Sequence, residues 1–190
     1  MKSWYPEDVL TFCPSCGTRG FEPSDRTQQP IMHLHCSSCG FGLFINAAAS
    51  VVVLIEKQPG LLLMTRRLKE PEQGTLDLPG GFIDPGERAE DAAAREVFEE
   101  CGLRVRDLKL QNRTYCNQYR YGGLTYYTLD LVFTCSAENW DELSEDGDEV
   151  ETLLIQKEHI NPSDVGFVSV RNIVLDYLQG RIFTCGLGET

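Results

Sequence analysis

The 190-residue chain has few basic side chains, with 17 lysines and arginines against 29 aspartates and glutamates, and a formal net charge of −12. Residues 1–44 show the same shortage, carrying three basic and four acidic side chains. Non-specific binding to nucleic acid or to an anionic membrane surface depends on clustered basic residues. We therefore expect neither nucleic acid nor a membrane among the partners of this protein.

Long hydrophobic runs are also lacking. The longest, residues 47–55, is interrupted only by Ser50 and is far shorter than the roughly 20 residues of a membrane-spanning helix. Residues 1–12 do not show the basic-then-apolar pattern of a secretory signal. From these two observations we expect a cytoplasmic protein. Four cysteines in apolar or strand-like contexts are consistent with this, because a reducing compartment lets them stay free. These are Cys101, Cys116, Cys135 and Cys185.

One segment contains most of the residues that point to a chemical function. Residues 80–103 read GGFIDPGERAEDAAAREVFEECGL. On a helix, Glu96, Glu99 and Glu100 stand at i, i+3 and i+4, so their carboxylates share one face. Like charges in this arrangement repel, and hard divalent cations, which prefer oxygen ligands, offset the repulsion. A solvated acidic face is the alternative interpretation.

The residues around this run define a helix and a loop. Asp84–Glu87 supplies turn residues before the helical pattern, and Gly102 follows its end. Gly80 and Gly81 allow the backbone to approach a ligand closely, so a carbonyl there is a candidate metal ligand. An apolar stripe for docking on a sheet is expected from Ala93, Ala94, Val97, Phe98 and Cys101. The apolar face of the helix is therefore expected to pack on the sheet, and the face with the glutamates is expected to bind the metal ion.

The spacing of Gly81, Glu87, Leu103 and the run Arg95–Gly102 resembles the Nudix box, including its apolar positions. The resemblance implies an α/β fold, a Nudix α/β/α sandwich with a mixed sheet. It also implies hydrolysis of a nucleoside diphosphate linked to another moiety, with water activated by Mg²⁺ or Mn²⁺. A diphosphate resists hydrolysis because its negative charge repels a nucleophile, so catalysis has to neutralise that charge.

The same resemblance implies roles for individual residues. The implied metal ligands are the Gly81 carbonyl, Glu96, Glu99 and Glu100. Arg95 would orient these glutamates, and Glu87 would brace the loop against the helix.

The general base is left open, because in this family it comes either from the box or from a distant loop. Residues 138–151 carry eight acidic side chains and no lysine or arginine. Glu149 and Glu151 lie closest to the apolar run at residues 153–155, and Glu149 is our candidate base outside the box. The alternative for this segment is a solvated acidic loop.

Four cysteines form a second motif. Cys13 and Cys16 make one Cys-x-x-Cys-Gly pair and Cys36 and Cys39 make another, with nineteen residues between the pairs. This spacing suits a single tetrahedral Zn²⁺ and resembles a zinc ribbon. The alternatives are a disulfide pair or unrelated thiols.

The two motifs divide the chain into a zinc ribbon, residues 1–44, and a Nudix hydrolase domain, residues 45–190. A module as small as the ribbon buries little core. Its expected role is a metal-stapled cap on the hydrolase or a site of self-association, with a homodimer as one candidate assembly.

A ribbon directly before the box resembles the NADH pyrophosphatases within the Nudix family. Residues 103–161 contain no proline, so they lack the Ser-Gln-Pro-Trp-Pro-Phe-Pro motif that these enzymes carry soon after the box. We expect a small-molecule nucleotide of ADP-ribose or dinucleotide type as the substrate. The alternatives are a nucleoside triphosphate pool-cleansing pyrophosphatase and a non-catalytic nucleotide sensor, although a sensor would be free to lose carboxylates that this chain retains.

The remaining sequence predicts two β-hairpins and a C-terminal amphipathic helix. Strands are expected at residues 50–56, 61–65, 115–121 and 124–134, with the second turn at Gly122 and Gly123. The helix is expected over residues 170–178, ending near Gly180.

Substrate contacts are expected from two basic and two aromatic residues. Arg66 and Arg67 lie between the second strand and the glycine loop, within reach of phosphates, although ordinary surface bases are the alternative. Tyr119 and Phe167 are candidates to stack on a nucleotide base. The alternative for the tyrosine is an ordinary strand residue.

Overall fold

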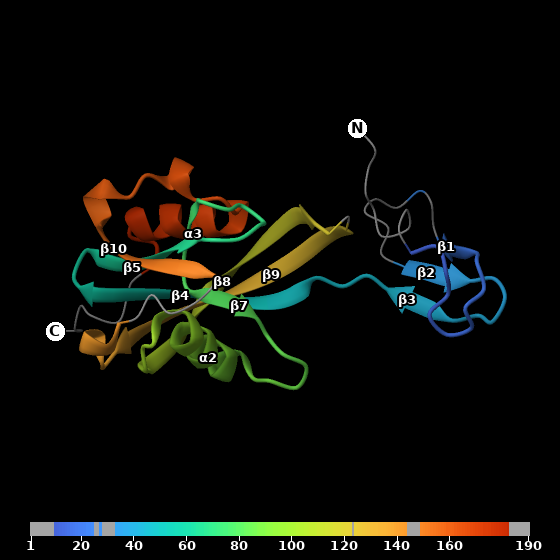
Figure 1. Ribbon diagram of the computed structural model, residues 1–190, viewed down its shortest axis with the longest axis horizontal. Coiled ribbons are helices and arrows are strands. Elements are labelled where there is room, and N and C mark those ends of the chain that lie inside the picture. The colour runs from blue at the N-terminus through green and yellow to red at the C-terminus, as the bar shows by residue number, and fades with distance from the viewer. Residues whose placement is uncertain (1–9, 25–26, 28–32, 123, 144–148, 183–190) are drawn as a thin grey trace. The chain divides into compact units, whose positions relative to one another are not determined.

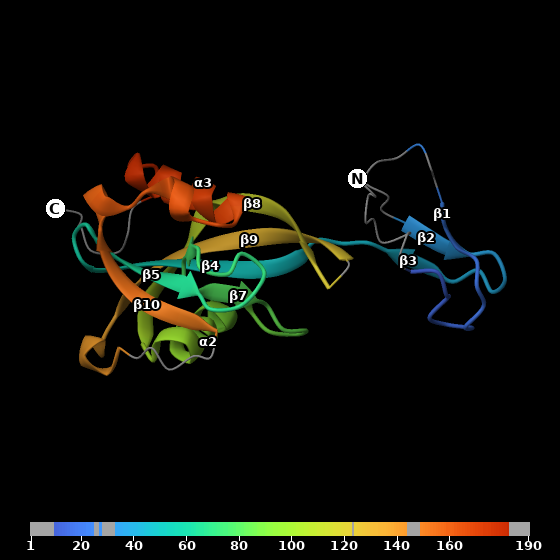
Figure 2. The same cartoon turned by 45° about the horizontal axis from the view of Figure 1, so that its top comes forward.

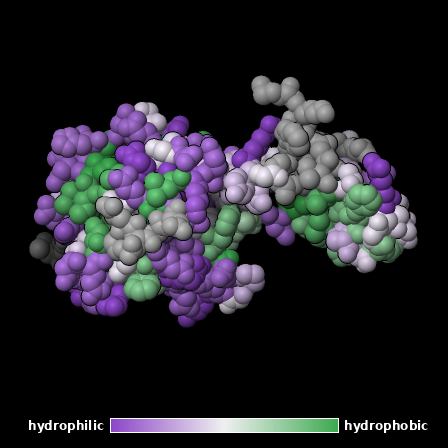
Figure 3. Space-filling view, in the orientation of Figure 1, coloured by the Kyte–Doolittle hydropathy of each residue, from purple (hydrophilic) through white to green (hydrophobic). Residues whose placement is uncertain are grey.

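A computed structural model describes residues 10–24, 27, 33–122, 124–143 and 149–182 (Figure 1). The turn residue Gly123, the thiol of Cys185 and acidic residues 144–148 lie outside the described residues. Within these ranges, no helix is both long and apolar enough to cross a bilayer. The visible face of the larger part of the molecule carries mostly hydrophilic side chains, in keeping with the net charge of −12 (Figure 3).

The chain forms two compact units. The first comprises Met1–Ala47 with Gln118–Tyr127, and the second comprises Ala48–Asn117 with Thr128–Thr190. The chain passes from one unit to the other near the expected change of domain at residue 44. The assignment of separate roles to residues 1–44 and 45–190 stays a prediction.

A small antiparallel sheet forms the N-terminal module. Its strands, in spatial order, are β1 (Phe21–Pro23), β2 (His33–Cys36) and β3 (Gly42–Phe44). Besides Pro23, which is buried on β1, the buried core cluster of this module consists of Cys13, Phe21, Leu34 and Cys36. Because two of these four residues are cysteines, the apolar core of the module is very small and a metal would contribute much of its stability.

The second sheet has seven strands. These are β4 (Ala48–Gln58), β5 (Leu61–Arg67), β6 (Leu76–Asp77), β7 (Gly80–Phe82), β8 (Val105–Tyr121), β9 (Leu124–Ala137) and β10 (Val150–Gln156). The main order is β10-β5-β4-β9-β8, with β6 paired to β5 and β7 to β4. β4 and β9 are parallel, whereas β10, β6 and β7 pair antiparallel to their neighbours. The predicted mixed sheet is confirmed.

The sheet is split where β6 and β7 enter it. β4 and β5 pair directly near the turn that joins them. Further along, β7 pairs with β4 and β6 pairs with β5, while the Val53 N–H donates to the Pro79 carbonyl at 2.8 Å. Residues 76–82 therefore lie between β4 and β5, and the glycine loop is part of the sheet.

Two helices cover the two faces of this sheet, α2 (Ala89–Cys101) on one and α3 (Val168–Leu178) on the other (Figure 2). Successive side chains of β4 point to opposite faces. Val51 and Val53 belong to the core that α2 covers, whereas Val52 and Leu54 belong to the core that α3 covers. The predicted α/β/α sandwich is confirmed. Short 3₁₀ helices follow β9 and β10, at Trp140–Glu142, Lys157–His159 and Pro162–Asp164.

Two details differ from the predictions. Phe98 does not dock on the sheet, since its side chain is 52% exposed. It follows the buried Val97 and therefore points about 100° away around the helix. β8 begins at Val105, well before the predicted strand, because its first half is an exposed sheet edge with no alternation of apolar residues.

The buried Asp176 of α3 ties this helix to β8. Its carboxylate accepts hydrogen bonds from the Tyr115 hydroxyl at 2.6 Å, from Arg113 Nη1 at 2.9 Å and from Arg181 Nη1 at 2.7 Å. The Tyr115 hydrogen bond is the main reason that the pKa of Asp176 lies below its usual range, and the two arginines add to it.

We expect Asp176→Asn to lower the free energy of unfolding by about 2 kcal/mol at pH 7, the scale of hydrogen bonds to a charged group. A lowered carboxyl pKa contributes stability above the unfolded pKa of about 3.9, and this contribution disappears as the pH falls through the folded pKa. The two proteins should therefore converge in acid. Urea unfolding at pH 7 and pH 3 measures this. An equal loss at both pH values would contradict the prediction.

Candidate metal and diphosphate site

The glycine loop and helix α2 meet through close backbone contacts. A Cβ on Gly81 would lie 2.5 Å from Glu96 Cδ, so the backbone of Gly81 lies directly against the Glu96 carboxylate. The Gly80 N–H donates to Glu100 Oε2 at 3.1 Å, and a Cβ on Gly80 would lie 2.1 Å from the Val51 carbonyl oxygen. Gly80 therefore requires glycine, because its neighbour is backbone, whereas a side chain on Gly81 would displace the Glu96 carboxylate.

Arg95 organises the carboxylates of the box. Its Nε and Nη2 donate to the two oxygens of Glu87, both at 2.8 Å. Nη1 donates to Glu96 at 2.8 Å and to Glu99 at 3.0 Å, and Nη2 also donates to the Phe82 carbonyl at 3.0 Å. These five hydrogen bonds equal the five N–H donors of a guanidinium. Arg95 is therefore fully used in orienting protein groups.

Glu87 has a structural role in this arrangement. Its carboxylate accepts the Arg95 hydrogen bonds and also the Asp84 N–H at 3.0 Å. The hydrogen bonds from Arg95, followed by that from the Asp84 backbone, lower the pKa of Glu87 to about 2. Glu87 therefore joins the turn at residues 84–87 to the middle of α2.

Glu96 and Glu100 are less well compensated. Burial raises the pKa of Glu96. Burial, with the nearby charges of Asp77 and Glu96, raises the pKa of Glu100 to about 8. Buried carboxylates that lack enough positive charge favour a cation between them. The carboxylate oxygens and the adjacent backbone carbonyl of Gly81 are of the donor type that a hard divalent metal ion prefers.

The two candidate arginines are the last two residues of β5. The sequence-based prediction places them after the strand, between it and the glycine loop. Arg67 Nη1 donates to Asp77 Oδ2 at 3.2 Å, and its charge offsets a small part of the burial-driven rise in the pKa of Glu100. The side chain of Arg66 points to the opposite face of the strand from that of Arg67, and its Nε lies 3.3 Å from Glu151 Oε2. The structure thus brings Arg67 to the carboxylates of the box, whereas Arg66 forms an ion pair with β10.

The two candidate aromatic residues lie in different surroundings. Phe167 precedes α3 and packs partly against the core, and the Arg67 guanidinium lies 4.9 Å from its ring centroid. Tyr119 lies near the tip of the β8–β9 hairpin and stacks on Tyr126, with 5.6 Å between ring centroids. Phe167 therefore belongs to the surroundings of Arg67, and Tyr119 belongs to the hairpin.

Glu149, the candidate base outside the box, lies next to the end of β5. Its carbonyl accepts the Leu68 N–H at 2.8 Å, and its side chain is 77% exposed and lies 3.9 Å from Lys69 Nζ. The next residue, Val150, begins β10 opposite Arg67. Arg67 contacts Asp77 and lies near Glu100, so Glu149 lies at the same end of the sheet as these residues.

Sequence reasoning missed one residue of this region, Asp77. Its side chain is 11% exposed, and it lies on β6 between Arg67 and the glycine loop. Burial raises the pKa of Asp77 to about 6, although Arg67 is adjacent. The only sequence signal was an acidic residue in an otherwise apolar stretch, Leu76 to Leu78.

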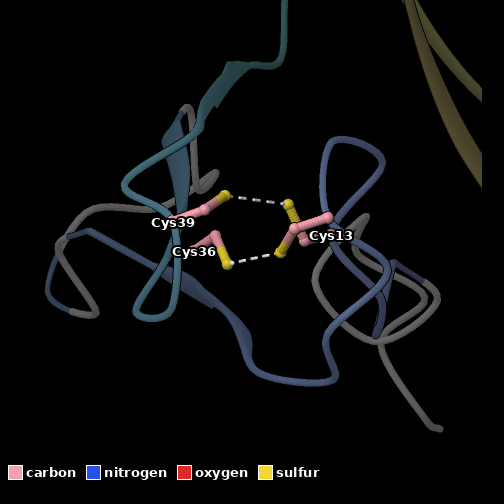
Figure 4. Close-up of side chains that lie close together, drawn as sticks. Cys13, Cys36 and Cys39 are labelled. Carbon is pink, nitrogen blue, oxygen red and sulfur yellow. Dashed lines mark hydrogen bonds between the residues drawn. The ribbon is translucent and has the colours of Figure 1, made fainter.

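The four cysteines of the N-terminal module come together as predicted. Their sulfurs all lie within 4.8 Å of one another, and Cys13, Cys36 and Cys39 are seen pointing toward a common centre (Figure 4). The Sγ–Sγ distances are 3.7 Å for Cys13–Cys39 and for Cys16–Cys36. Tetrahedral Zn–S bonds of about 2.3 Å place sulfurs at about this separation. No disulfide joins the cysteines in the described part of the chain.

This chain belongs to the NUDIX domain family, whose model matches residues 45–167. It is similar to the NAD-capped RNA hydrolase NudC of Haemophilus influenzae, with 29% identity over 134 residues, 68% of this chain and 49% of that protein. It is also similar to the ADP-ribose pyrophosphatase of Methanocaldococcus jannaschii, with 41% identity over 63 residues, 33% of this chain and 37% of that protein. The chain spans about half or less of the length of these relatives.

Solved structures support the same fold. A crystal structure of a NUDIX hydrolase from Nitrosomonas europaea covers 90% of this chain with a TM-score of 0.62 and 21% identity, and 92% of that chain is matched. A second NUDIX hydrolase structure from the same organism covers 74% of this chain and is matched over 94% of its own length, with a TM-score of 0.58 and 23% identity. The predicted Nudix fold is confirmed.

Proposed function

We propose that this protein is a Mg²⁺- or Mn²⁺-dependent pyrophosphohydrolase that cleaves a nucleoside diphosphate linked to another moiety. The observation that carries the proposal is the packing of Glu96 against Gly81 and of Glu100 against the Gly80 N–H, with Arg95 holding Glu96 and Glu99. The names of the relatives support it, because ADP-ribose and an NAD cap share a diphosphate linkage.

The residues that would hold the metal are Gly81, through its carbonyl, and Glu96, Glu99 and Glu100. When bound there, the cation neutralises phosphate charge and lowers the pKa of a coordinated water. Arg95 keeps the glutamates in place, since all its donors are used on protein groups. A site that is ordered before substrate binds needs no reorganisation during reaction.

The remaining candidates have proposed roles in accepting a proton and in binding substrate. Glu149 is exposed at the end of the sheet and is the proposed base outside the box. Arg66 and Arg67 would bind phosphate oxygens, for which a guanidinium provides a planar set of donors. Phe167, beside Arg67, would provide aromatic surface for a nucleotide base, and Tyr119 stays a separate candidate on the β8–β9 hairpin.

The N-terminal module is proposed to hold one structural Zn²⁺ through its four cysteines. The sulfur separations and the four-thiolate donor set support this assignment. Its proposed role is a cap or a site of self-association. Phe12 and Phe44 support a contact role, since they are 60% and 65% exposed.

Diphosphate-linked substrates such as ADP-ribose or a dinucleotide should be cleaved faster than plain nucleoside triphosphates. We expect this because the names of both relatives refer to compounds with such a linkage. The measurement is kcat/KM for a panel of diphosphate-linked compounds, dNTPs and oxidised dGTP with Mg²⁺, followed by mononucleotide release. Much faster turnover of a triphosphate would support a pool-cleansing role instead. Binding of the panel without any turnover would indicate a nucleotide sensor.

NAD-capped RNA is a second candidate substrate, favoured by the name of the Haemophilus relative. The charge balance of the chain argues against a long RNA contact, and the exclusion of nucleic acid stays a prediction. A comparison of a capped RNA with the matching dinucleotide, at two salt concentrations, separates these cases. A rate advantage for the RNA that disappears with salt would establish RNA as a substrate.

A further inference from the structure

Arg67 differs from Arg95 in how its donors are used. Its Nε donates to the Pro71 carbonyl at 2.6 Å and its Nη1 donates to Asp77 at 3.2 Å. Within the described ranges, its three other N–H groups have no hydrogen-bond partner, and the side chain is 24% exposed. Arg67 is therefore held in place while most of its donors remain available for a ligand.

Three contacts fix the plane of this guanidinium. The Pro71 carbonyl and the Asp77 carboxylate bind two of its nitrogens, and the Phe167 ring lies 4.9 Å from its central carbon. Guanidinium groups stack on aromatic rings and bind carboxylates in a fixed plane. A side chain with many rotamers is thereby ordered before substrate binds, which lowers the entropic cost of binding.

Asp77 also contacts the loop that leads to the metal ligands. Its Oδ1 accepts the Leu78 N–H at 2.9 Å, whereas its Oδ2 accepts Arg67 Nη1. Two residues further on, the Gly80 N–H donates to Glu100. One buried carboxylate therefore connects the arginine to the backbone that carries Gly80 and Gly81.

We propose that Asp77 is a positioning residue, which orients Arg67 to bind a phosphate of a diphosphate substrate beside the metal ligands. The inference deepens the proposed function and rests on it for the identity of the substrate. Asp77 itself is expected to make no contact with substrate, and Phe167 supports the arginine from its other side.

The test is a double-mutant cycle of Asp77→Asn and Arg67→Gln, read as the Kd of ADP with Mg²⁺ by calorimetry. Each single variant is expected to weaken ADP binding about tenfold, the scale of one charge-assisted hydrogen bond. The double variant should bind like Arg67→Gln alone, because Asp77 acts through Arg67. KM for ADP-ribose should rise in parallel, with kcat changed much less.

Two further variants guard against a general effect on folding or charge. Phe167→Leu removes the ring beside Arg67 without altering Asp77. It should weaken binding of inorganic pyrophosphate with Mg²⁺ severalfold, even if Asp77→Asn fails to fold, and pyrophosphate has no base that could stack on the ring. Glu90→Gln removes an exposed negative charge of α2 outside the box, and it should bind ADP like the wild type.

Several results would overturn the inference. Asp77→Asn that binds ADP normally would show that Arg67 does not need it. A further tenfold loss from Asp77→Asn in the Arg67→Gln background would mean that Asp77 acts elsewhere, as would unchanged pyrophosphate binding by Phe167→Leu. Wild-type protein that fails to bind ADP would also refute it. If wild-type protein binds ADP but cleaves no diphosphate-linked compound, the proposed function fails while the role of Asp77 stands.

Discussion

Glu96→Gln and Glu100→Gln are each expected to lower kcat/KM by about a hundredfold or more, the scale for losing one group that stabilises transition-state charge. Both glutamates lie against the glycine loop, so a neutral isostere removes a metal ligand without opening a cavity. The measurement is ADP-ribose hydrolysis at saturating Mg²⁺. Circular dichroism should show an unchanged fold.

Glu100→Gln should also raise the melting temperature of metal-free protein at neutral and alkaline pH. The raised pKa of Glu100, about 8, means that Glu100 binds a proton more tightly in the folded protein than in the unfolded chain. Stability is then highest below the unfolded pKa of about 4.3 and declines as the pH rises through the folded pKa. The glutamine variant loses this pH dependence. The difference in melting temperature between the variant and the wild type should therefore increase from pH 5 to pH 8.5.

Glu90→Gln is the matched control, since Glu90 is an exposed residue of α2 outside the box. It should retain near-complete activity. Wild-type rates for Glu100→Gln at saturating Mg²⁺ would show that α2 is not the metal site, and the acidic segment around Glu149 would become the place to test.

The purified protein is expected to contain one zinc per chain, and Cys36→Ser should lose it. Zinc binding to four thiolates contributes about 10–16 kcal/mol to the folding of small modules, and the described apolar core of this module is very small. Removal of zinc should therefore unfold residues 10–47 before the second unit. Elemental analysis measures the metal, and amide hydrogen exchange locates the unfolded region.

Cys116→Ser provides the control for this prediction, because Cys116 is an exposed free thiol on β8. It should keep its zinc and its exchange pattern. Zinc well below one per chain in protein purified without chelator would argue against the site. Unchanged metal content in Cys36→Ser would do the same.

Local signals made much of this structure predictable. The box predicted α2 and its end at Gly102, which has a left-handed φ of 70°. The cysteine spacing predicted the cluster of four sulfurs. Alternating or continuous apolar residues predicted β4 and β5, and a helical period predicted α3. In each case a short sequence motif, or two such motifs, is enough to predict the element or cluster.

The features that were missed depend on contacts between distant segments. The two residues of β6 are too few to show a period, and they form a strand because β5 lies beside them. The first half of β8 has only three apolar residues, which do not form a regular alternation, so pairing with β9 rather than its own pattern makes it a strand. The Asp77 side chain is oriented by hydrogen bonds from Arg67 and from the Leu78 N–H. The bond from Arg67 joins two different strands, so the residues next to Asp77 in the sequence do not reveal it.

The split between β4 and β5 divides the site into a fixed part and an adjustable part. Residues 76–82 share hydrogen bonds with both strands, so Gly80, Gly81 and the carboxylates against them cannot shift without breaking the sheet. Opening and closing during turnover would therefore be confined to segments outside the split. A new substrate preference could arise in those segments by insertion or exchange of side chains, while the hydrolytic machinery kept a single geometry.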